Sequence, residues 1–264
     1  MILVIAEPGC TAEGDLGTMI EQIDMVAARG ANIYKAQWTS DPAAMVARRH
    51  APAYAQVYQW LAFPAAWHES LARRCAMRDI RYACSVYLAQ DAAVVAPHVA
   101  FVKVSSFEAA DPVLIEAALA TGREVIISTG MMSREQVEAL IDYGPQVTLL
   151  HCVSAYPAPI TETNLSVLTW QRADGFGPVF SGLSDHSRNV LMGGFAVCAG
   201  AQILEAHVAH KGARGSNPDF PVTFTPDEFV QYVRHIRTAE AIMGDGVKRA
   251  MPSEDAMRGY QVTA

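Results

Sequence analysis

Residues 179–187 read VFSGLSDHS and join an apolar run to three chemically active side chains. The run is typical of a buried strand, and it ends in Ser184, Asp185 and His186, a hydroxyl, a carboxylate and an imidazole. Three interpretations compete: a hydrolytic dyad, a metal ligand, and an ordinary polar turn that closes a strand. The choice between them depends on the residues at which the other strands of the chain end.

Short apolar and β-branched runs recur along the whole sequence and alternate with helical patterns. They predict strands over residues 2–7, 31–38, 80–87, 100–106, 124–129, 146–153, 179–185 and 202–208. Apolar side chains at helical spacing predict helices over residues 16–29, 66–77, 112–121, 133–143 and 226–243. Asp111 and Ser133 are expected N-caps, and Gly30, Gly122 and Gly144 follow helix ends.

The alternation of strands and helices predicts the fold class α/β. Eight strands, each followed by a helix or a loop, favour a single (β/α)8 TIM barrel over residues 1–264, with a C-terminal tail at 249–264. An open doubly wound sheet is the alternative, but no GxGxxG follows any strand. Long loops are expected at the C-terminal face of the barrel, over residues 39–65 and 209–224.

Composition excludes several classes of function. The chain has 264 residues, of which 51% are apolar and 18% charged, and its net charge of −7 offers no basic field for nucleic acid. No apolar run approaches the length of a membrane span, and the N-terminus has no signal-peptide pattern. Five cysteines without a CxxC pair are typical of reduced thiols, so we expect a cytoplasmic protein.

In a barrel, chemically active residues are expected where strands end. Lys35 and Lys103 each stand among apolar neighbours near such an end, and serines end several other strands. Ammonium groups with hydroxyls around them suit an anion such as phosphate. Two alternatives remain open, because a lone lysine often snorkels to solvent and some barrels use a lysine to form a Schiff base.

Two histidines predict a metal site. His186 and His207 end the last two strands, which are neighbours in a barrel, so both imidazoles can reach one point above it. Two histidine ligands with open positions describe a catalytic centre better than a structural one. His151 and His210 are rival candidates, and a hydrogen-bonded core histidine is the alternative for each.

The hydrolase interpretation of residues 184–186 is excluded by geometry. Consecutive residues in an extended chain point to opposite sides and cannot form a hydrogen-bonded triad. No GxSxG motif occurs elsewhere. Asp185 is therefore expected to point away from the site and to hold the turn.

These motifs together resemble the sialic acid synthase family, whose members condense phosphoenolpyruvate with N-acetylmannosamine or a related aldose. The matching stretches occur in order from the first strand almost to the end of the chain. They are IAEPGCTAEGDL (5–16), IYKAQW (33–38), FVKVSSFE (101–108), VIISTGMM (125–132), LLHCVSAYPAP (149–159), GLSDHS (182–187), ILEAHVA (203–209) and PSED (252–255).

The resemblance implies a TIM barrel that releases phosphate from phosphoenolpyruvate, and it implies a role for each matching residue. The implied phosphoenolpyruvate ligands are Lys35, Ser85, Lys103, Ser106, Ser128, Ser154 and Ser184. The implied metal ligands are His186 and His207, with Mn²⁺ the expected metal. The residues implied to face the sugar are Glu7, Gln37, Glu108, Tyr156 and Asp219, with Glu7 or Glu108 a candidate for acid–base work.

The chain departs from the family pattern in three places. The turn at residues 10–14 lacks the family's His and Asn, and Ala206 stands where the family has a lysine. The sequence ends before the small antifreeze-like domain that in the family contacts the sugar of a partner subunit. We therefore expect a different or smaller aldose, with Arg214 or residues 39–65 closing the mouth, and a homodimer through the barrel.

Two further functional alternatives stay open at this point. One is a Schiff-base aldolase acting through Lys35 or Lys103. The other is a non-catalytic relative that binds a sugar phosphate or a partner protein, and the altered turn at residues 10–14 is its best support.

Overall fold

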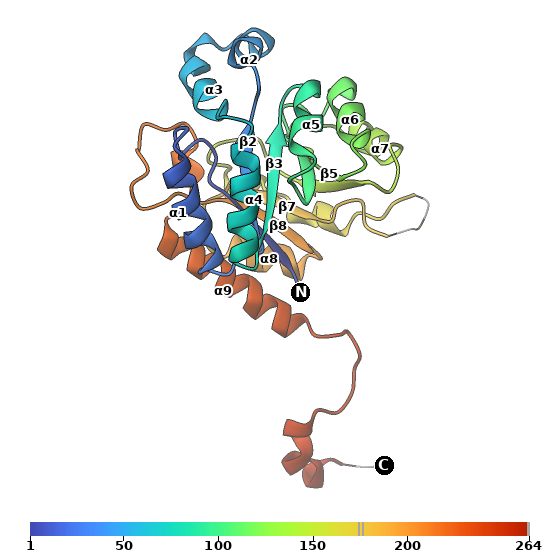
Figure 1. Ribbon diagram of the computed structural model, residues 1–264. Coiled ribbons are helices and arrows are strands. Elements are labelled where there is room, and N and C mark those ends of the chain that lie inside the picture. The colour runs from blue at the N-terminus through green and yellow to red at the C-terminus, as the bar shows by residue number, and fades with distance from the viewer. Residues whose placement is uncertain (174, 176, 263–264) are drawn as a thin grey trace.

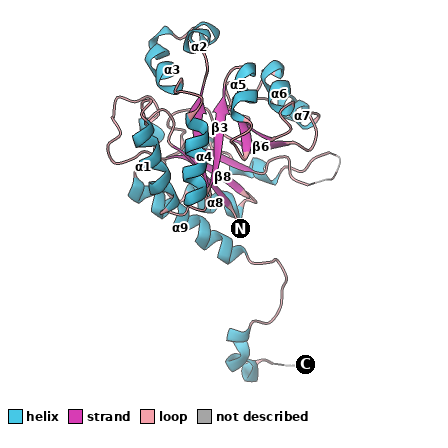
Figure 2. Cartoon of the chain, in the orientation of Figure 1, coloured by secondary structure: helices cyan, strands magenta, loops and turns pink. Residues whose placement is uncertain are grey.

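The strands of the protein form one closed parallel barrel, as the sequence predicts (Figures 1 and 2). We describe a computed structural model of the chain over residues 1–173, 175 and 177–262. The strands follow one another around the barrel in chain order, and β1 closes it by pairing with β8. They are β1 (Leu3–Glu7), β2 (Ile33–Trp38), β3 (Arg81–Val86), β4 (Phe101–Val104), β5 (Glu124–Ser128), β6 (Val147–His151), β7 (Gly182–Asp185) and β8 (Ile203–His207).

Helices cover the outside of the barrel and include all those that the periodicity predicts. The predicted helices are α1 (Leu16–Ala27), α4 (Trp67–Met77), α6 (Pro112–Leu119), α7 (Arg134–Ile141) and α9 (Pro226–Met243). The structure adds α5 (Ala89–Val95) and α8 (Met192–Cys198). Between β6 and β7 the described residues form the short 3-10 turns η2 (Ile160–Glu162) and η3 (Leu165–Thr169) in place of an α-helix.

The predicted helix ends are confirmed by their capping contacts. The Asp111 carboxylate accepts hydrogen bonds from the backbone N–H groups of Val113 and Leu114, and Ser133 forms a capping box with Gln136. Gly30, Gly122 and Gly144 all have the positive φ of a left-handed cap.

The inward faces of the strands form an apolar layer below a polar one. Side chains on the same face of a strand are two residues apart. One buried apolar cluster fills the lower part of the barrel, and it consists of Ile5, Ile33, Ala83, Phe101, Ile126, Leu150 and Ile203. Two residues further along the same faces stand Glu7, Lys35, Lys103 and Glu205. The lower layer closes the barrel floor, so that the polar layer lies at the mouth.

The predicted long loop over residues 39–65 is largely helical. It holds α2 (Pro42–Arg49), the 3-10 turn η1 (Pro52–Tyr54) and α3 (Ala55–Leu61), which stand above the ends of β2 and β3 (Figure 1). We call residues 42–61 the cap. Met45, Tyr58 and Leu61 of the cap are buried in a cluster with Tyr87 and Leu88, which follow β3. The cap therefore packs on the end of the barrel at which the strands terminate.

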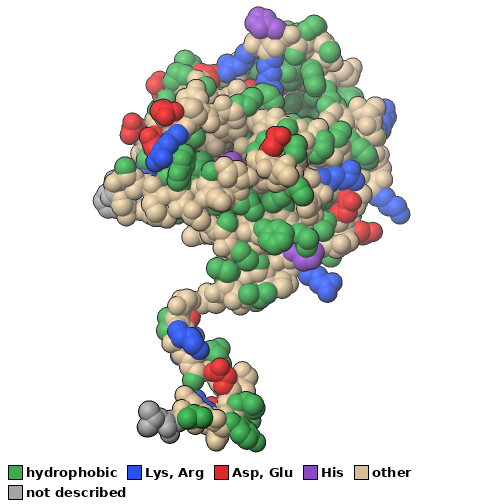
Figure 3. All heavy atoms as spheres, turned by 180° about the vertical axis from the view of Figure 1, so that it is seen from behind, with side chains coloured by type: hydrophobic (Ala, Val, Ile, Leu, Met, Phe, Trp, Pro, Cys, Tyr) green, Lys and Arg blue, Asp and Glu red, His purple; other side chains and the backbone are tan. Residues whose placement is uncertain are grey.

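The C-terminal segment leaves the barrel after α9. Residues 244–262, with the 3-10 helix η5 (Pro252–Tyr260), stand clear of the barrel and are exposed throughout (Figures 1 and 3). Within the described part of the chain, no helix is both long and apolar enough to cross a membrane.

Candidate active site

A cavity of about 540 Å³ lies at the carboxyl ends of the strands, under the cap. This is the end of a TIM barrel that carries active sites. Most of the predicted site residues line the cavity, namely Glu7, Lys35, Gln37, Ser85, Lys103, Ser106, Glu108, Ser128, Tyr156, Ser184, His186, His207 and Asp219. Ser154 and Arg214 do not line it.

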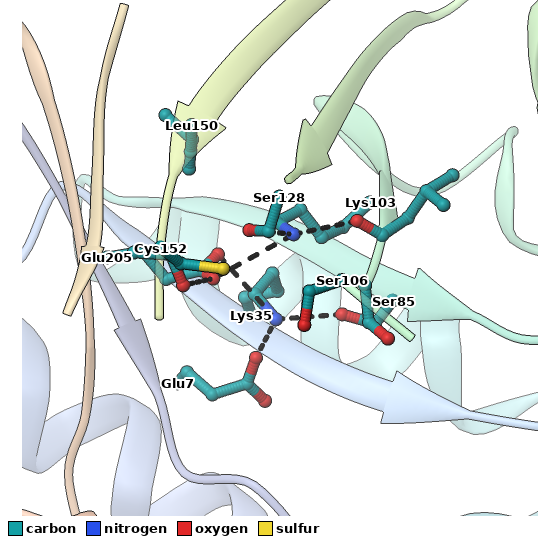
Figure 4. Close-up of polar contacts among 12 residues, drawn as sticks. Glu7, Lys35, Ser85, Lys103, Ser106, Ser128, Leu150, Cys152 and Glu205 are labelled. Carbon is teal, nitrogen blue, oxygen red and sulfur yellow. Dashed lines mark hydrogen bonds and ion pairs between the residues drawn. The ribbon is translucent and has the colours of Figure 1, made fainter. Parts of the chain in front are cut away.

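Two buried lysines form the floor of the cavity, and each is held by a serine (Figure 4). Lys35 Nζ donates a hydrogen bond of 2.7 Å to Ser85 Oγ on the neighbouring strand. Lys103 Nζ donates one of 2.8 Å to Ser128 Oγ, also one strand away. The two lysines lie inside the barrel and not at its surface, which argues against snorkelling.

Glu205 lies between the two lysines, and no sequence pattern had assigned it a role. Its Oε2 is 3.7 Å from Lys35 Nζ, and its Oε1 is 3.9 Å from Lys103 Nζ. Ser184 Oγ donates a hydrogen bond of 2.8 Å to Oε1. Strand alternation could have predicted this position, because Glu205 stands two residues before His207 and therefore on the same inward face.

Glu7 also contacts Lys35 Nζ. The floor of the cavity therefore pairs two lysines, Lys35 and Lys103, with two glutamates, Glu7 and Glu205. Burial lowers the pKa of Lys35 to about 8, although Glu205 opposes this shift. Burial would raise the pKa of Glu205, but the charges of Lys103 and Lys35 outweigh it and leave this pKa below its usual range. Glu205 is therefore ionised at neutral pH and compensates the lysines.

His186 and His207 stand together above this floor, with ring centroids 5.6 Å apart. Burial, with the neighbouring His207, lowers the pKa of His186 to about 4, and burial lowers that of His207 as well. Both rings are thus neutral at pH 7, the form that binds metals. His186 Nδ1 lies 2.8 Å from the Val153 carbonyl oxygen, which leaves its Nε2 as the lone-pair nitrogen.

The histidine pair fits a metal in part. His207 Nδ1 is buried without a hydrogen-bond partner among the described residues, as expected for an atom that awaits a ligand. In the same part of the chain, no three His, Cys, Asp or Glu side chains are grouped to hold a metal ion. The rivals lie elsewhere, since neither His151 nor His210 lines the cavity.

Aromatic rings form one wall of the cavity. The Tyr156 ring lies 4.4 Å from the His186 ring and 6.1 Å from the His207 ring, centroid to centroid. Phe107 stacks with Tyr156 at 6.5 Å between ring centroids and is half exposed. Such exposed ring faces suit the apolar C–H face of a sugar.

Ser154 contributes through a neighbour and not through the cavity wall. Its Oγ lies 2.7 Å from Ser106 Oγ, which does line the cavity. Gly130 leaves the space for this contact, because a Cβ at Gly130 would come within 2.1 Å of Ser154 Oγ. A larger residue at Gly130 would displace the Ser154 hydroxyl.

The loop after β8 is fastened to the loop after β1. Asp219 accepts a hydrogen bond of 2.9 Å from the Cys10 backbone N–H, and Asn217 Nδ2 donates one of 3.0 Å to the Cys10 carbonyl oxygen. The turn at residues 10–14, which departs from the family pattern, thus helps to hold Asp219 at the cavity edge. Asp185 lies outside the cavity and accepts from Ser187 N at 2.8 Å, which confirms that it holds the turn.

Arg214 does not lie in the site, contrary to the expectation that it helps to close the mouth. Its side chain is 74% exposed and pairs with Glu13, with Nε 3.4 Å from Oε2. Its neighbours Gly215 and Ser216 are also exposed, and Arg214 does not line the cavity. The basic residues at the mouth are instead Arg48 and Arg49 of the cap, which line the cavity and were not predicted.

Comparison with known proteins finds relatives that share one kind of name. N,N'-diacetyllegionaminic acid synthase from Campylobacter jejuni is 26% identical over 96% of this chain and 80% of its own. The enzyme of the same name from Legionella pneumophila is 37% identical over 51% of this chain and 39% of its own. In the latter match, as in several others, the chain spans less than half of the relative's length.

Solved structures agree over the whole barrel. The N-acetylneuraminic acid synthetase of Leptospira borgpetersenii superposes with a TM-score of 0.85 and 26% identity, covering 98% of this chain and 90% of its own. The sequence pattern of the NeuB family matches residues 22–248, which is most of the barrel. The chain therefore belongs to the NeuB family.

Proposed function

We propose that this protein condenses phosphoenolpyruvate with an aldose and releases phosphate, in the manner of a nonulosonic acid synthase. The observation that carries the proposal is the pair of buried lysines, each bonded to a serine hydroxyl, below two neutral histidines. The names of its relatives, which are legionaminic, pseudaminic and sialic acid synthases, support the same reaction class.

The floor of the cavity suits the phosphate and carboxylate of phosphoenolpyruvate. Lys35 and Lys103 would supply positive charge, and Ser85, Ser106 and Ser128 would supply directional donors. The same ammonium groups would stabilise the charge that develops on the departing phosphate. Because Glu7 and Glu205 compensate the lysines, the protein can bury these cations before substrate arrives.

The reaction balances with water as the third reactant. C3 of phosphoenolpyruvate forms a bond to the aldehyde carbon, and the aldehyde oxygen takes up a proton. Water then adds to the cationic C2 and gives up one proton. The new C2 hydroxyl loses its remaining proton and becomes the C2=O carbonyl as the bond between C2 and the phosphate oxygen breaks, and phosphate leaves with that proton. Glu7 would accept the proton of that water, and its burial beside Lys35 in the lining of the cavity supports this role.

His186 and His207 would hold a divalent metal, with Mn²⁺ as our proposal. When bound, such an ion acts as a Lewis acid and a template for the aldehyde oxygen. The chain's own contribution is to keep both imidazoles neutral by burial and to fix the His186 tautomer through the Val153 carbonyl. The Tyr156 ring covers the pair and limits access of water.

The test is release of phosphate from phosphoenolpyruvate against a panel of aldoses that includes N-acetylmannosamine, with Mn²⁺ present. Release that requires one aldose supports the proposal, and the smaller aldoses in the panel test the expected preference. No release with any member, despite calorimetric binding of phosphoenolpyruvate, would favour the non-catalytic alternative.

A Schiff-base aldolase is the second candidate. The lowered pKa of Lys35 favours it, because a lysine must lose its proton to form an imine. Against it, the Glu7 carboxylate contacts the ammonium and stabilises its charged form. Borohydride with pyruvate would trap a covalent adduct in an aldolase, whereas the proposed synthase would remain unmodified.

A further inference from the structure

Arg49 ties the cap to the wall of the cavity. It is the last residue of α2, and the chain reverses directly after it at His50, which has a left-handed φ of 48°. From this position the guanidinium reaches across the mouth to the loop after β4. Its Nε lies 3.1 Å from Glu108 Oε1, and Nη2 contacts the same oxygen.

Two aromatic rings hold the guanidinium in place. Its central carbon lies 4.8 Å from the centre of the Phe107 ring and 5.5 Å from that of the Tyr87 ring. Phe107 is also the ring that stacks on Tyr156, which covers the histidine pair. Arg49 is thus connected through two rings, those of Phe107 and Tyr156, to the histidine pair beside which the aldehyde is expected.

Glu108 is fully engaged by this arrangement. Its side chain is 2% exposed, Oε1 accepts from Arg49, and Oε2 accepts from Ser105 Oγ. A carboxylate held on both oxygens is suited to positioning hydroxyl groups and not to carrying protons. This separates Glu108 from Glu7, the other candidate for acid–base work.

We propose that Arg49 positions the aldose: it holds the cap closed on the mouth and fixes the Glu108 carboxylate in the wall of the cavity. The part that concerns the aldose rests on the proposed function. Among the described residues, the ammonium groups of Lys35 and Lys103 at the barrel floor pair with serines and glutamates other than Glu108, so the two substrates should respond differently to a change at Arg49.

The neighbouring arginine shares only the tethering of the cap and does not contact Glu108 or line up with an aromatic ring among the described residues. Arg48 pairs with Asp111, whose carboxylate caps α6, and the Arg48 side chain is 36% exposed, against 24% for Arg49. Arg48 also has no aromatic ring against its guanidinium among the described contacts. It adds a second, outer tether between the cap and the same loop.

The test compares Arg49→Gln, Arg49→Lys and a matched control, Arg74→Gln. Arg74 forms a similar two-nitrogen pair with Asp24, but on the outer surface between α1 and α4. We measure hydrogen exchange of residues 42–61, calorimetric binding of phosphoenolpyruvate, and the KM of each substrate with an aldose that the wild type turns over.

In Arg49→Gln we expect faster exchange across the cap and a KM for the aldose raised about tenfold, with the KM for phosphoenolpyruvate within about twofold of wild type. For Arg49→Lys we expect cap exchange and an aldose KM between those of the wild type and Arg49→Gln, because a lysine keeps the charge but loses the planar guanidinium. Arg74→Gln should leave cap exchange and both KM values unchanged.

Glu108→Gln completes a double-mutant cycle. If Arg49 acts through Glu108, the double variant should be little worse than either single one. Exchange of the cap equal to wild type in Arg49→Gln, or equal rises in both KM values, overturns the proposal. If the wild type turns over no aldose, the proposed function fails, and cap exchange still decides whether Arg49 holds the cap.

Discussion

Lys35 Nζ lies 3.7 Å from Glu205 Oε2, and both side chains are almost completely buried inside the barrel. A buried cation of this kind is stable only with a partner, and Glu205 serves Lys103 in the same way. The charges that we propose for substrate binding are therefore also part of the fold, and we expect changes to them to affect stability and binding to different extents.

Glu205→Gln keeps the shape of the side chain and removes its charge. We expect the free energy of unfolding to fall by about 3 kcal/mol, because two buried lysines lose a counter-charge. Affinity for phosphoenolpyruvate should not weaken, since the floor becomes more positive. Urea denaturation and calorimetric titration measure the two effects. Glu138→Gln, which breaks an exposed pair with Arg134, should cost less than about 1 kcal/mol.

Lys103→Gln removes one of the two charges proposed for the phosphate. We expect the dissociation constant for phosphoenolpyruvate to rise by about tenfold or more, because a charge-assisted hydrogen bond becomes a neutral one. Lys211→Gln is the control, since Lys211 is exposed in the loop after β8. Equal losses in both variants would show that Lys103 acts only through net charge.

Removal of metal tests the role of the histidine pair. A chelator should abolish phosphate release, and Mn²⁺ should restore it. His186→Ala and His207→Ala should each weaken Mn²⁺ binding, followed by electron paramagnetic resonance, by about tenfold or more. His151→Gln should bind Mn²⁺ as the wild type does, because the His151 ring instead bonds the Thr163 carbonyl oxygen. Undiminished activity in chelator would contradict a metal site.

Acid should destabilise the barrel partly through His68. Burial, with His98 nearby, lowers the pKa of His68 from 6.5 to about 4. Between these pH values the unfolded chain binds a proton at His68 that the folded chain does not. The contribution of His68 to the free energy of unfolding is therefore fully present above about pH 6.5 and is lost as the pH falls toward 4. The contribution is roughly 3 kcal/mol at most. Unfolding curves of His68→Gln should show a weaker dependence on pH over this range, and an unchanged slope would assign the loss to other groups.

The sequence predicted the barrel because its strands and their alternation are local patterns. Lys35 and Lys103 were found through apolar neighbours, and His186 and His207 through their positions at adjacent strand ends. Glu205 was missed although it stands on the same inward face as His207. Its role depends on both lysines, which come from strands far away in the sequence.

The cap shows where sequence reasoning stops. No period or motif relates Arg49 to Glu108, which lies 59 residues away, and the pairing depends on how α2 sits on the barrel. The same limit explains the error over Arg214, which is basic and follows the last strand but points to solvent. Charge in a loop does not tell which way the loop folds.

The pairing of β1 with β8 sets the order in which this protein can form. Leu3 pairs with Ile203 and Glu7 with His207, so the contacts that close the barrel join the two ends of the chain. Contacts of such long sequence separation form slowly. A chain still under synthesis holds Lys35 and Lys103 long before Glu205 exists to compensate them. Lys35 has Glu7 as an early partner, but Lys103 gains its carboxylate partner only with β8, so the charged floor of the cavity is completed only when the last strand joins the barrel.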